Sequence, residues 1–172
     1  MYLLDADTLI KAKNTYYQFD RVRPFWEWLV YQAEMGEVRM PIETWVKIGD
    51  KTPERRDDLA LWAIEHKDTL VIEDRSYDER FPDVLAMYRW PDGRPLTEAD
   101  IETIGDDYQL IACAIHNKAT VITGEVYAGS VGPNRKVPNV CEDLGIDWTN
   151  LEGSVGKPGL VDILDFRTDW NK

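Results

Sequence analysis

The sequence predicts a single α/β domain built around a parallel sheet. Short apolar runs alternate along the chain with longer segments of helical periodicity, an order typical of a parallel sheet covered by helices. The segment Tyr108–Asn117 (YQLIACAIHN) is helical and apolar on nearly every side, which indicates burial between two layers. The next run, Ala119–Thr123 (ATVIT), is β-branched and typical of a buried parallel strand. A length of 172 residues is that of one domain.

Two predicted strands, each followed by a helix, form the N-terminal part of this pattern. The first apolar run ends at Asp5, as expected of a buried strand that carries carboxylates at its C-terminal end. Pro24 suits the first turn of a helix, and Gly36 is a suitable stop for that helix. The predicted elements are strands at Met1–Leu4 and Val38–Met40 and helices at Pro24–Ala33 and Ile42–Ile48.

The rest of the chain continues the alternation with more interruptions. The dipeptide Thr52-Pro53 predicts the start of a helix that continues through His66. Ser76–Tyr88 is predicted to be helical, although Pro82 lies inside it. The remaining predicted elements are a strand or extended link at Thr69–Ile72, a helix at Val137–Leu144 and a last strand at Ile146–Thr149.

The composition excludes several classes of protein. Hydrophobic residues make up 44% of the chain and seven residues are tryptophan, which is too apolar for a disordered acidic tail. No apolar run approaches the roughly 18 residues of a membrane span, and the first residues do not resemble a secretory signal. Cys113 and Cys141 match no metal or redox spacing and suit a reducing compartment. We therefore expect a cytoplasmic domain without membrane contact.

Acidic residues follow the two most clearly predicted strands. Asp5 and Asp7 come directly after the first strand, and Glu125 comes two residues after Thr123. Asp107 opens the apolar helix. Because ligands of open parallel sheets bind beyond the C-terminal ends of the strands, we expect these side chains at one crevice. Taken singly, each is more simply a helix cap or a solvated loop residue.

Taken together, these acidic residues predict a metal site. Carboxylates at one edge of a sheet repel each other, so a fold keeps them together only where a cation offsets that repulsion. Oxygen ligands without neighbouring His or Cys favour Mg²⁺ or Mn²⁺ over zinc. Such an ion suits phosphodiester hydrolysis because it lowers the pKa of bound water and stabilises the charge that develops on phosphate.

Several stretches of the chain resemble PIN-domain nucleases. The stretches LLDADTLI and DYQLIACAIHNKATVITGE carry the general resemblance, and Ala12–Leu29 and Lys136–Leu151 resemble a PIN subfamily described as of unknown function. These four separated blocks occur in the right order and cover residues 1–151. The resemblance implies a three-layer α/β/α fold with a central parallel sheet, and it leaves residues 152–172 as a Gly-rich C-terminal tail of unassigned role.

The resemblance also implies roles for individual residues. Asp5, Asp107 and Glu125 match the first, third and fourth acids of a metal-binding quartet. Asp7 matches a polar position that supports the first acid, and Thr123 matches a hydroxyl residue that orients the ligands.

The second acid of the quartet is where the chain departs from the family. The best alignment of PIETWVKIG puts Lys47 at that position, and Glu43 lies one turn earlier on the same helix face. Glu43 could supply the missing metal ligand. Alternatively, Lys47 could contact substrate phosphate or occupy the cation's place and weaken the enzyme. Asp106 precedes Asp107, and the spacing to the apolar helix favours Asp107 as the third acid.

Polar residues after the first strand should rim the same crevice. Lys13 and Asn14, together with Lys11, Tyr16 and Tyr17, could hold backbone phosphate and stack a base of single-stranded RNA. An ordinary polar loop with packed tyrosines is the alternative, and both interpretations stay open.

Two further expectations concern the surface. Lys136 is expected to be a solvated surface residue. Trp26 and Trp28 are not expected to face the core together, so Trp28 is expected at the surface, where it could mark a dimer face.

The function implied by the resemblance is that of an Mg²⁺- or Mn²⁺-dependent endoribonuclease that cleaves single-stranded RNA. It further implies the toxin of a type II toxin–antitoxin pair, a homodimer neutralised by a cognate antitoxin protein. The alternative is a catalytically weak PIN-like scaffold that acts by protein–protein interaction, as Lys47 and the net charge of −12 suggest. A DNA-directed flap-type nuclease ranks third, because 172 residues leave little room for the arches that thread a flap. The acidity predicts weak, salt-sensitive binding of RNA.

Overall fold

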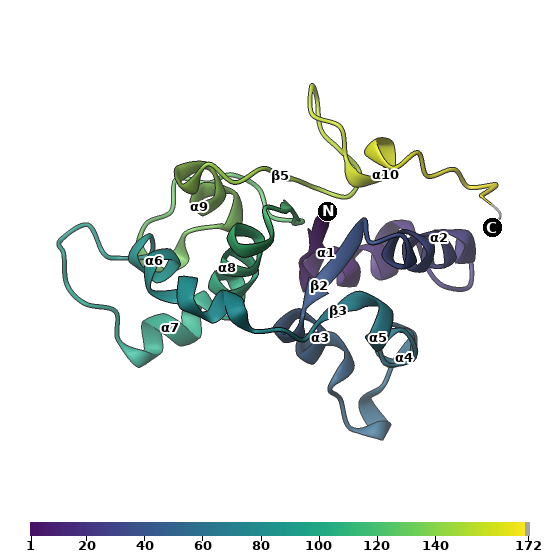
Figure 1. Cartoon of the computed structure of the whole chain (residues 1–172), viewed down its shortest axis with the longest axis horizontal. Coiled ribbons are helices and arrows are strands. Elements are labelled where there is room, and N and C mark those ends of the chain that lie inside the picture. The colour runs from purple at the N-terminus through teal and green to yellow at the C-terminus, as the bar shows by residue number, and fades with distance from the viewer. Residues whose placement is uncertain (171–172) are drawn as a thin grey trace.

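The computed structural model describes residues 1–170, in which five strands form one parallel sheet in the order β3-β2-β1-β4-β5 (Figure 1). The register pairs Tyr2 of β1 with Val38 of β2 on one side and with Thr120 of β4 on the other. The predicted α/β fold with a central parallel sheet is therefore confirmed. The strands are β1 Tyr2–Leu4, β2 Val38–Pro41, β3 Val71–Ile72, β4 Thr120–Ile122 and β5 Trp148–Thr149.

Helices cover both faces of the sheet, and within residues 1–170 none is long and apolar enough to cross a membrane. The α-helices are α1 Ala6–Lys11, α2 Arg23–Glu34, α3 Ile42–Gly49, α4 Asp58–Glu65, α5 Lys67–Leu70, α6 Phe81–Ala86, α7 Glu98–Ile104, α8 Asp107–Asn117, α9 Val137–Leu144 and α10 Leu160–Ile163. Shorter helical segments are the π-helix η1 Ala12–Tyr16 and the 3₁₀ turns η2 Pro53–Arg55, η3 Ser76–Arg80 and η4 Gly132–Asn134.

Two hydrophobic cores lie on opposite faces of the sheet. Successive residues of a strand point to opposite faces, so Leu3 of β1 packs in the core with α8 and α9, whereas Leu4 packs in the core with α2 and α4. Figure 1 shows α6, α8 and α9 on one side of the sheet and α2, α4 and α5 on the other. This is the three-layer α/β/α arrangement that was predicted.

The strand order places the point where the winding of the sheet reverses between β1 and β4. The chain runs from β1 through β2 to β3 at one edge and then places β4 and β5 on the other side of β1. Open α/β sheets bind ligands where the direction of winding reverses in this way. The backbone N–H of Asp5 and the hydroxyl of Thr8 both donate to the carbonyl oxygen of Ile122, at 2.9 and 3.2 Å, and tie the two strand ends together.

The helix predicted to start at Thr52-Pro53 starts later, so that boundary is wrong. Asp57 is the N-cap of α4, and its carboxylate accepts a hydrogen bond from the backbone N–H of Ala60 at 2.9 Å. An aspartate in this position satisfies a helix N–H that would otherwise lack a partner. The residues around Pro53 form only the 3₁₀ turn η2.

The helical prediction for Ser76–Tyr88 is confirmed as far as Ala86, with a division near Pro82. The segment divides into η3 and α6, and Pro82 lies in the first turn of α6. Proline has no N–H to donate to the preceding turn, so it is tolerated at the start of a helix and not in its interior.

The C-terminal segment completes the core beneath α2. Trp28, expected at the surface, is fully buried, so that prediction is wrong. Its ring lies 5.1 Å from that of Phe166, which also packs edge-on against Phe25 at 5.5 Å. Leu160 of α10 is buried in the same core. Much of the predicted tail, from Leu160 to Trp170, therefore packs on the domain, whereas Val155 in the loop before α10 is fully exposed. Residues 171–172 lie outside the described residues.

Candidate functional site

Asp5 lies at the end of β1 and caps α1. Its carboxylate accepts hydrogen bonds from the hydroxyl of Thr123 at 2.8 Å and from the backbone N–H of Asp7 at 3.3 Å. Asp5 and Thr123 are both buried, the latter completely. Burial raises the pKa of Asp5 from 3.8 to about 6; the Thr123 hydroxyl works against this rise, and the charge of Asp7 adds to it. Thr123 therefore fixes the orientation of a buried carboxyl group. Its role in orienting a metal ligand stays a prediction.

Asp107, the first residue of α8, belongs to the same group of charges. Its pKa rises from 3.8 to about 8, mainly because of burial and then because of repulsion by Asp5, Glu125 and Asp106. Within the described residues, the side chain of Asp107 forms neither a hydrogen bond nor an ion pair. The structure thus brings Asp5 and Glu125 each within electrostatic reach of Asp107, whose own side chain has no hydrogen-bond or ion-pair partner among the described residues.

Glu125 is held at the start of α9. One carboxylate oxygen accepts from the backbone N–H of Val137 at 2.8 Å, and the other lies 2.7 Å from the ammonium of Lys136. The backbone N–H of Glu125 donates to the Thr123 hydroxyl at 3.2 Å. Thr123 therefore links the acids that follow β1 and β4. Lys136, expected to be a solvated surface residue, is half-exposed and pairs with a site residue.

Lys47 stands at the rim of this group. Its ammonium lies 3.4 Å from Asp7 and 3.2 Å from Asp106, and the charge of Asp5 also acts on it. These acidic neighbours raise the pKa of Lys47 against the opposing effect of its burial. Lys47 therefore offsets the charges of Asp7 and Asp106, which lie close in sequence to Asp5 and Asp107.

Glu43 has different partners. One of its oxygens accepts from the hydroxyl of Tyr77 at 2.7 Å, and the other lies 3.1 Å from the guanidinium of Arg75. Its side chain is only 12% exposed, so this arrangement largely shields its charge. The place of Glu43 among the metal ligands stays a prediction. A shallow pocket of about 380 Å³ lies between these groups, lined by Glu43, Lys47, Arg75, Asp106 and Gln109 among others.

The polar residues of η1 and the tyrosine that follows it differ in whether they are held by other parts of the domain or exposed. The ammonium of Lys13 pairs with Asp57 at 2.7 Å, so Lys13 anchors the start of α4. Asn14 is exposed. Tyr17 stacks on Phe25 at 3.9 Å and is part of the core, whereas Tyr16 is 48% exposed. A substrate contact by Lys13 or Asn14 stays a prediction.

The acids at this edge of the sheet carry oxygen ligands, but they are not grouped as a metal site. Among residues 1–170, no three His, Cys, Asp or Glu side chains are grouped closely enough to hold a metal ion as they lie. The three central acids nevertheless offer only carboxylate oxygens, the ligands that Mg²⁺ and Mn²⁺ prefer. Burial is the main cause of the raised pKa values of Asp5 and Asp107; neighbouring carboxylates raise them further, and the charge of Lys47 opposes the rise.

Three partners of the acidic residues were not predicted from the sequence. Lys136 carried a local signal, because it directly precedes a predicted helix whose N-terminus attracts an acidic group. Arg75 and Tyr77 carried none, because they reach Glu43 only through the folding of a segment more than 30 residues away.

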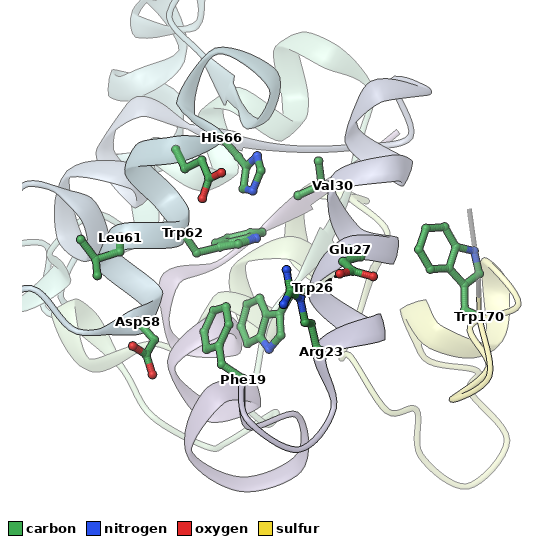
Figure 2. Close-up of a pocket in the computed structure, with 11 residues that line it drawn as sticks. Phe19, Arg23, Trp26, Glu27, Val30, Asp58, Leu61, Trp62, His66 and Trp170 are labelled. Atoms are coloured by element: carbon green, nitrogen blue, oxygen red, sulfur yellow. Dashed lines mark hydrogen bonds and ion pairs between the residues drawn. The ribbon is translucent and has the colours of Figure 1, made fainter.

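A larger pocket, of about 590 Å³, lies between α2 and α4 (Figure 2). Trp26 and Trp62 form its floor with their rings edge-to-face at 5.0 Å, and Leu61 is exposed on α4. Asp58 and Glu65 stand on the same helix without an ion pair to any described residue. The pocket is apolar with an acidic margin, and it contains none of the predicted catalytic residues.

Comparison with known proteins gives one match. A family described as Domain of unknown function (DUF4411) matches residues 2–157. No curated protein and no solved structure matches the chain.

Proposed function

The chain belongs to the DUF4411 family, and we propose that it is a divalent-metal-dependent endoribonuclease that cleaves single-stranded RNA. The observation that carries the proposal is that the buried carboxyl group of Asp107 is coupled electrostatically to Asp5, which follows β1, and to Glu125, which follows β4. A fold gains nothing in stability from burying mutually repelling carboxylates, so a cationic ligand is the simplest reason to keep them. The resemblance to PIN-domain nucleases points to the same residues.

Asp5, Asp107 and Glu125 would hold Mg²⁺ or Mn²⁺, which supplies an activated water and stabilises charge on the phosphate. Thr123 keeps the Asp5 carboxylate oriented through its 2.8 Å hydrogen bond. Lys47 and Lys136 bring positive charge to the rim, where an RNA phosphate could replace their present carboxylate partners. This role for Lys47 is the one that we adopt over a cation that blocks the site.

The overall charge limits how the RNA is bound. With a net charge of −12, the chain as a whole repels a polyanion, so RNA binding depends on the local positive charge of the lysines near the carboxylates. Binding should therefore be weak and should fall steeply as salt is added.

The biological setting that we propose is that of a type II toxin, a homodimer neutralised by a cognate antitoxin protein. An acidic surface suits a basic partner segment that docks electrostatically. Expression of the wild-type chain in a bacterial host should then arrest growth, and coexpression of the antitoxin should relieve the arrest.

The nuclease proposal is tested by incubating a labelled single-stranded RNA with Mn²⁺ and three proteins purified in parallel. The wild type and Asp83→Asn, which changes an exposed acid on α6, should cleave it, whereas Asp5→Asn should not. Equal cleavage by all three proteins would indicate a contaminating nuclease, and cleavage by none would contradict the proposal.

A second candidate function is that of a PIN-like scaffold that binds a protein partner. The apolar pocket between α2 and α4, with its unpaired carboxylates, favours this candidate (Figure 2). If expression of the chain arrests growth, the two candidates predict opposite results. A scaffold loses the effect in Leu61→Asp and keeps it in Asp5→Asn, and a nuclease behaves in the reverse way.

A further inference from the structure

A small pocket lies beside the carboxylate group, between η1 and the segments that follow β4 and β5. Its volume is about 250 Å³, and Thr8, Lys11, Tyr16, Gly124, Asn150 and Glu152 are among its lining residues. Gly124 stands between Thr123 and Glu125, and Thr8 lies within one turn of Asp5. The pocket therefore opens directly next to the residues proposed to act on the phosphodiester.

The pocket presents an aromatic surface with a nearby cation. Tyr16 is 48% exposed, and the ammonium of Lys11 lies 6.0 Å from the centre of its ring. Lys11 forms no ion pair within residues 1–170, unlike Lys13, which is held by Asp57. An exposed ring stacks a base of single-stranded nucleic acid, and a free lysine next to it can hold the adjoining phosphate.

Glu152 gives the pocket a hydrogen-bond preference. One of its oxygens accepts from the hydroxyl of Tyr17 at 3.1 Å, and its other oxygen forms no hydrogen bond in the described part of the chain. A carboxylate accepts hydrogen bonds and donates none while it is ionised. It therefore accepts readily from the exocyclic amino group of cytosine, adenine or guanine, whereas uracil has no amino group and presents two carbonyl oxygens.

We propose that this pocket binds one nucleobase of the RNA, stacked on Tyr16 and selected for an exocyclic amino group by Glu152. The inference deepens the proposed function and rests on its choice of single-stranded RNA as substrate. Tyr16 and Glu152 act here as specificity-determining residues, since neither belongs to the group that would hold the metal.

Binding and cleavage are measured separately to test this. Fluorescence anisotropy with labelled ten-nucleotide oligo(A), oligo(C) and oligo(U), on an Asp107→Asn background, reports binding without cleavage. Removing one stacked base contact weakens binding roughly 5- to 150-fold, so Tyr16→Ala should lose that factor on oligo(C). Tyr16→Phe should retain binding, because the ring remains. Glu152→Gln still accepts from Tyr17 and should reduce the preference for oligo(C) over oligo(U).

Tyr127→Ala is the matched control, because Tyr127 is 59% exposed and does not line the pocket. An equal loss in Tyr16→Ala and Tyr127→Ala, no loss in Tyr16→Ala, or no binding of any oligonucleotide would overturn the inference. If Tyr16-dependent binding is found and the wild type does not cleave, the nuclease proposal fails and the base pocket stands. If the wild type cleaves and Tyr16→Ala binds normally, only the base pocket fails.

Discussion

Replacing Asp107 with asparagine should stabilise the metal-free protein at alkaline pH. The substitution keeps the shape of the side chain and removes a charge that burial and three neighbouring carboxylates oppose. The folded-state pKa of about 8 lies above the ordinary value of 3.8, so the folded protein holds a proton that the unfolded chain loses. The contribution of protonated Asp107 to the free energy of unfolding is therefore complete below about pH 4 and declines as the pH rises to about 8.

The magnitude follows from that difference in pKa. At 1.36 kcal/mol per unit, the ionised group costs at most about 6 kcal/mol above pH 8. Because the repulsion is shared with Asp5 and Glu125, and because asparagine loses about 0.5 kcal/mol of helix-dipole stabilisation, we expect a net gain of about 2 kcal/mol. For a domain of this size, that corresponds to an increase in Tm of about 4–8 °C.

Thermal unfolding followed by circular dichroism in EDTA, at pH 5 and pH 8.5, measures this gain. Asp107→Asn should unfold at a higher temperature than the wild type at pH 8.5, and the difference should shrink at pH 5. Asp106→Asn is the matched control, since Asp106 is paired with Lys47 and its removal should not stabilise by more than about 1 kcal/mol. A lower Tm for Asp107→Asn at pH 8.5, or a gain that does not depend on pH, would refute the reasoning.

Three other predictions concern the support of the site and the core. Thr123→Val removes a hydrogen bond to a buried carboxylate, so urea unfolding at pH 7 should show a loss of about 1–3 kcal/mol; an unchanged midpoint would count against an orienting role. Phe166→Ala should destabilise by about 1–2 kcal/mol and shift the fluorescence of Trp28 to longer wavelength, and an unchanged spectrum would contradict the packing described for the C-terminal segment. Burial raises the pKa of both Cys113 and Cys141 to about 12. Iodoacetamide should therefore label the two thiols in urea and not in the native protein. Rapid labelling of the native protein would be inconsistent with their burial.

The central part of the fold was predictable because its signals are local. The apolar helix α8 and the strand β4 that follows it are largely buried, so their composition alone identifies them. The acids after β1 and β4 were likewise predictable, because the carboxyl ends of adjacent parallel strands must lie near each other.

Features that depend on contacts distant in sequence were not predictable in the same way. Trp28 was expected at the surface because Phe166, which packs against it, lies nearly 140 residues later in the chain. That segment has only a weak hydrophobic pattern. The partners of Glu43 are Arg75 and Tyr77, and neither carries a sequence signal that connects it with α3. The start of α4 depended on whether Thr52 or Asp57 caps the helix. The ion pair between Asp57 and Lys13, which are distant in sequence, favours Asp57.

Titration with Mn²⁺ followed by electron paramagnetic resonance of the free ion tests the central claim most directly, because it detects the cation without requiring the correct RNA. The wild type should bind Mn²⁺, and Asp107→Asn should lose most of that binding. Glu43→Gln should bind as the wild type does, because the carboxylate of Glu43 is held by Arg75 and Tyr77. Absence of binding by the wild type, or equal binding by Asp107→Asn, would contradict a metal site formed by Asp5, Asp107 and Glu125.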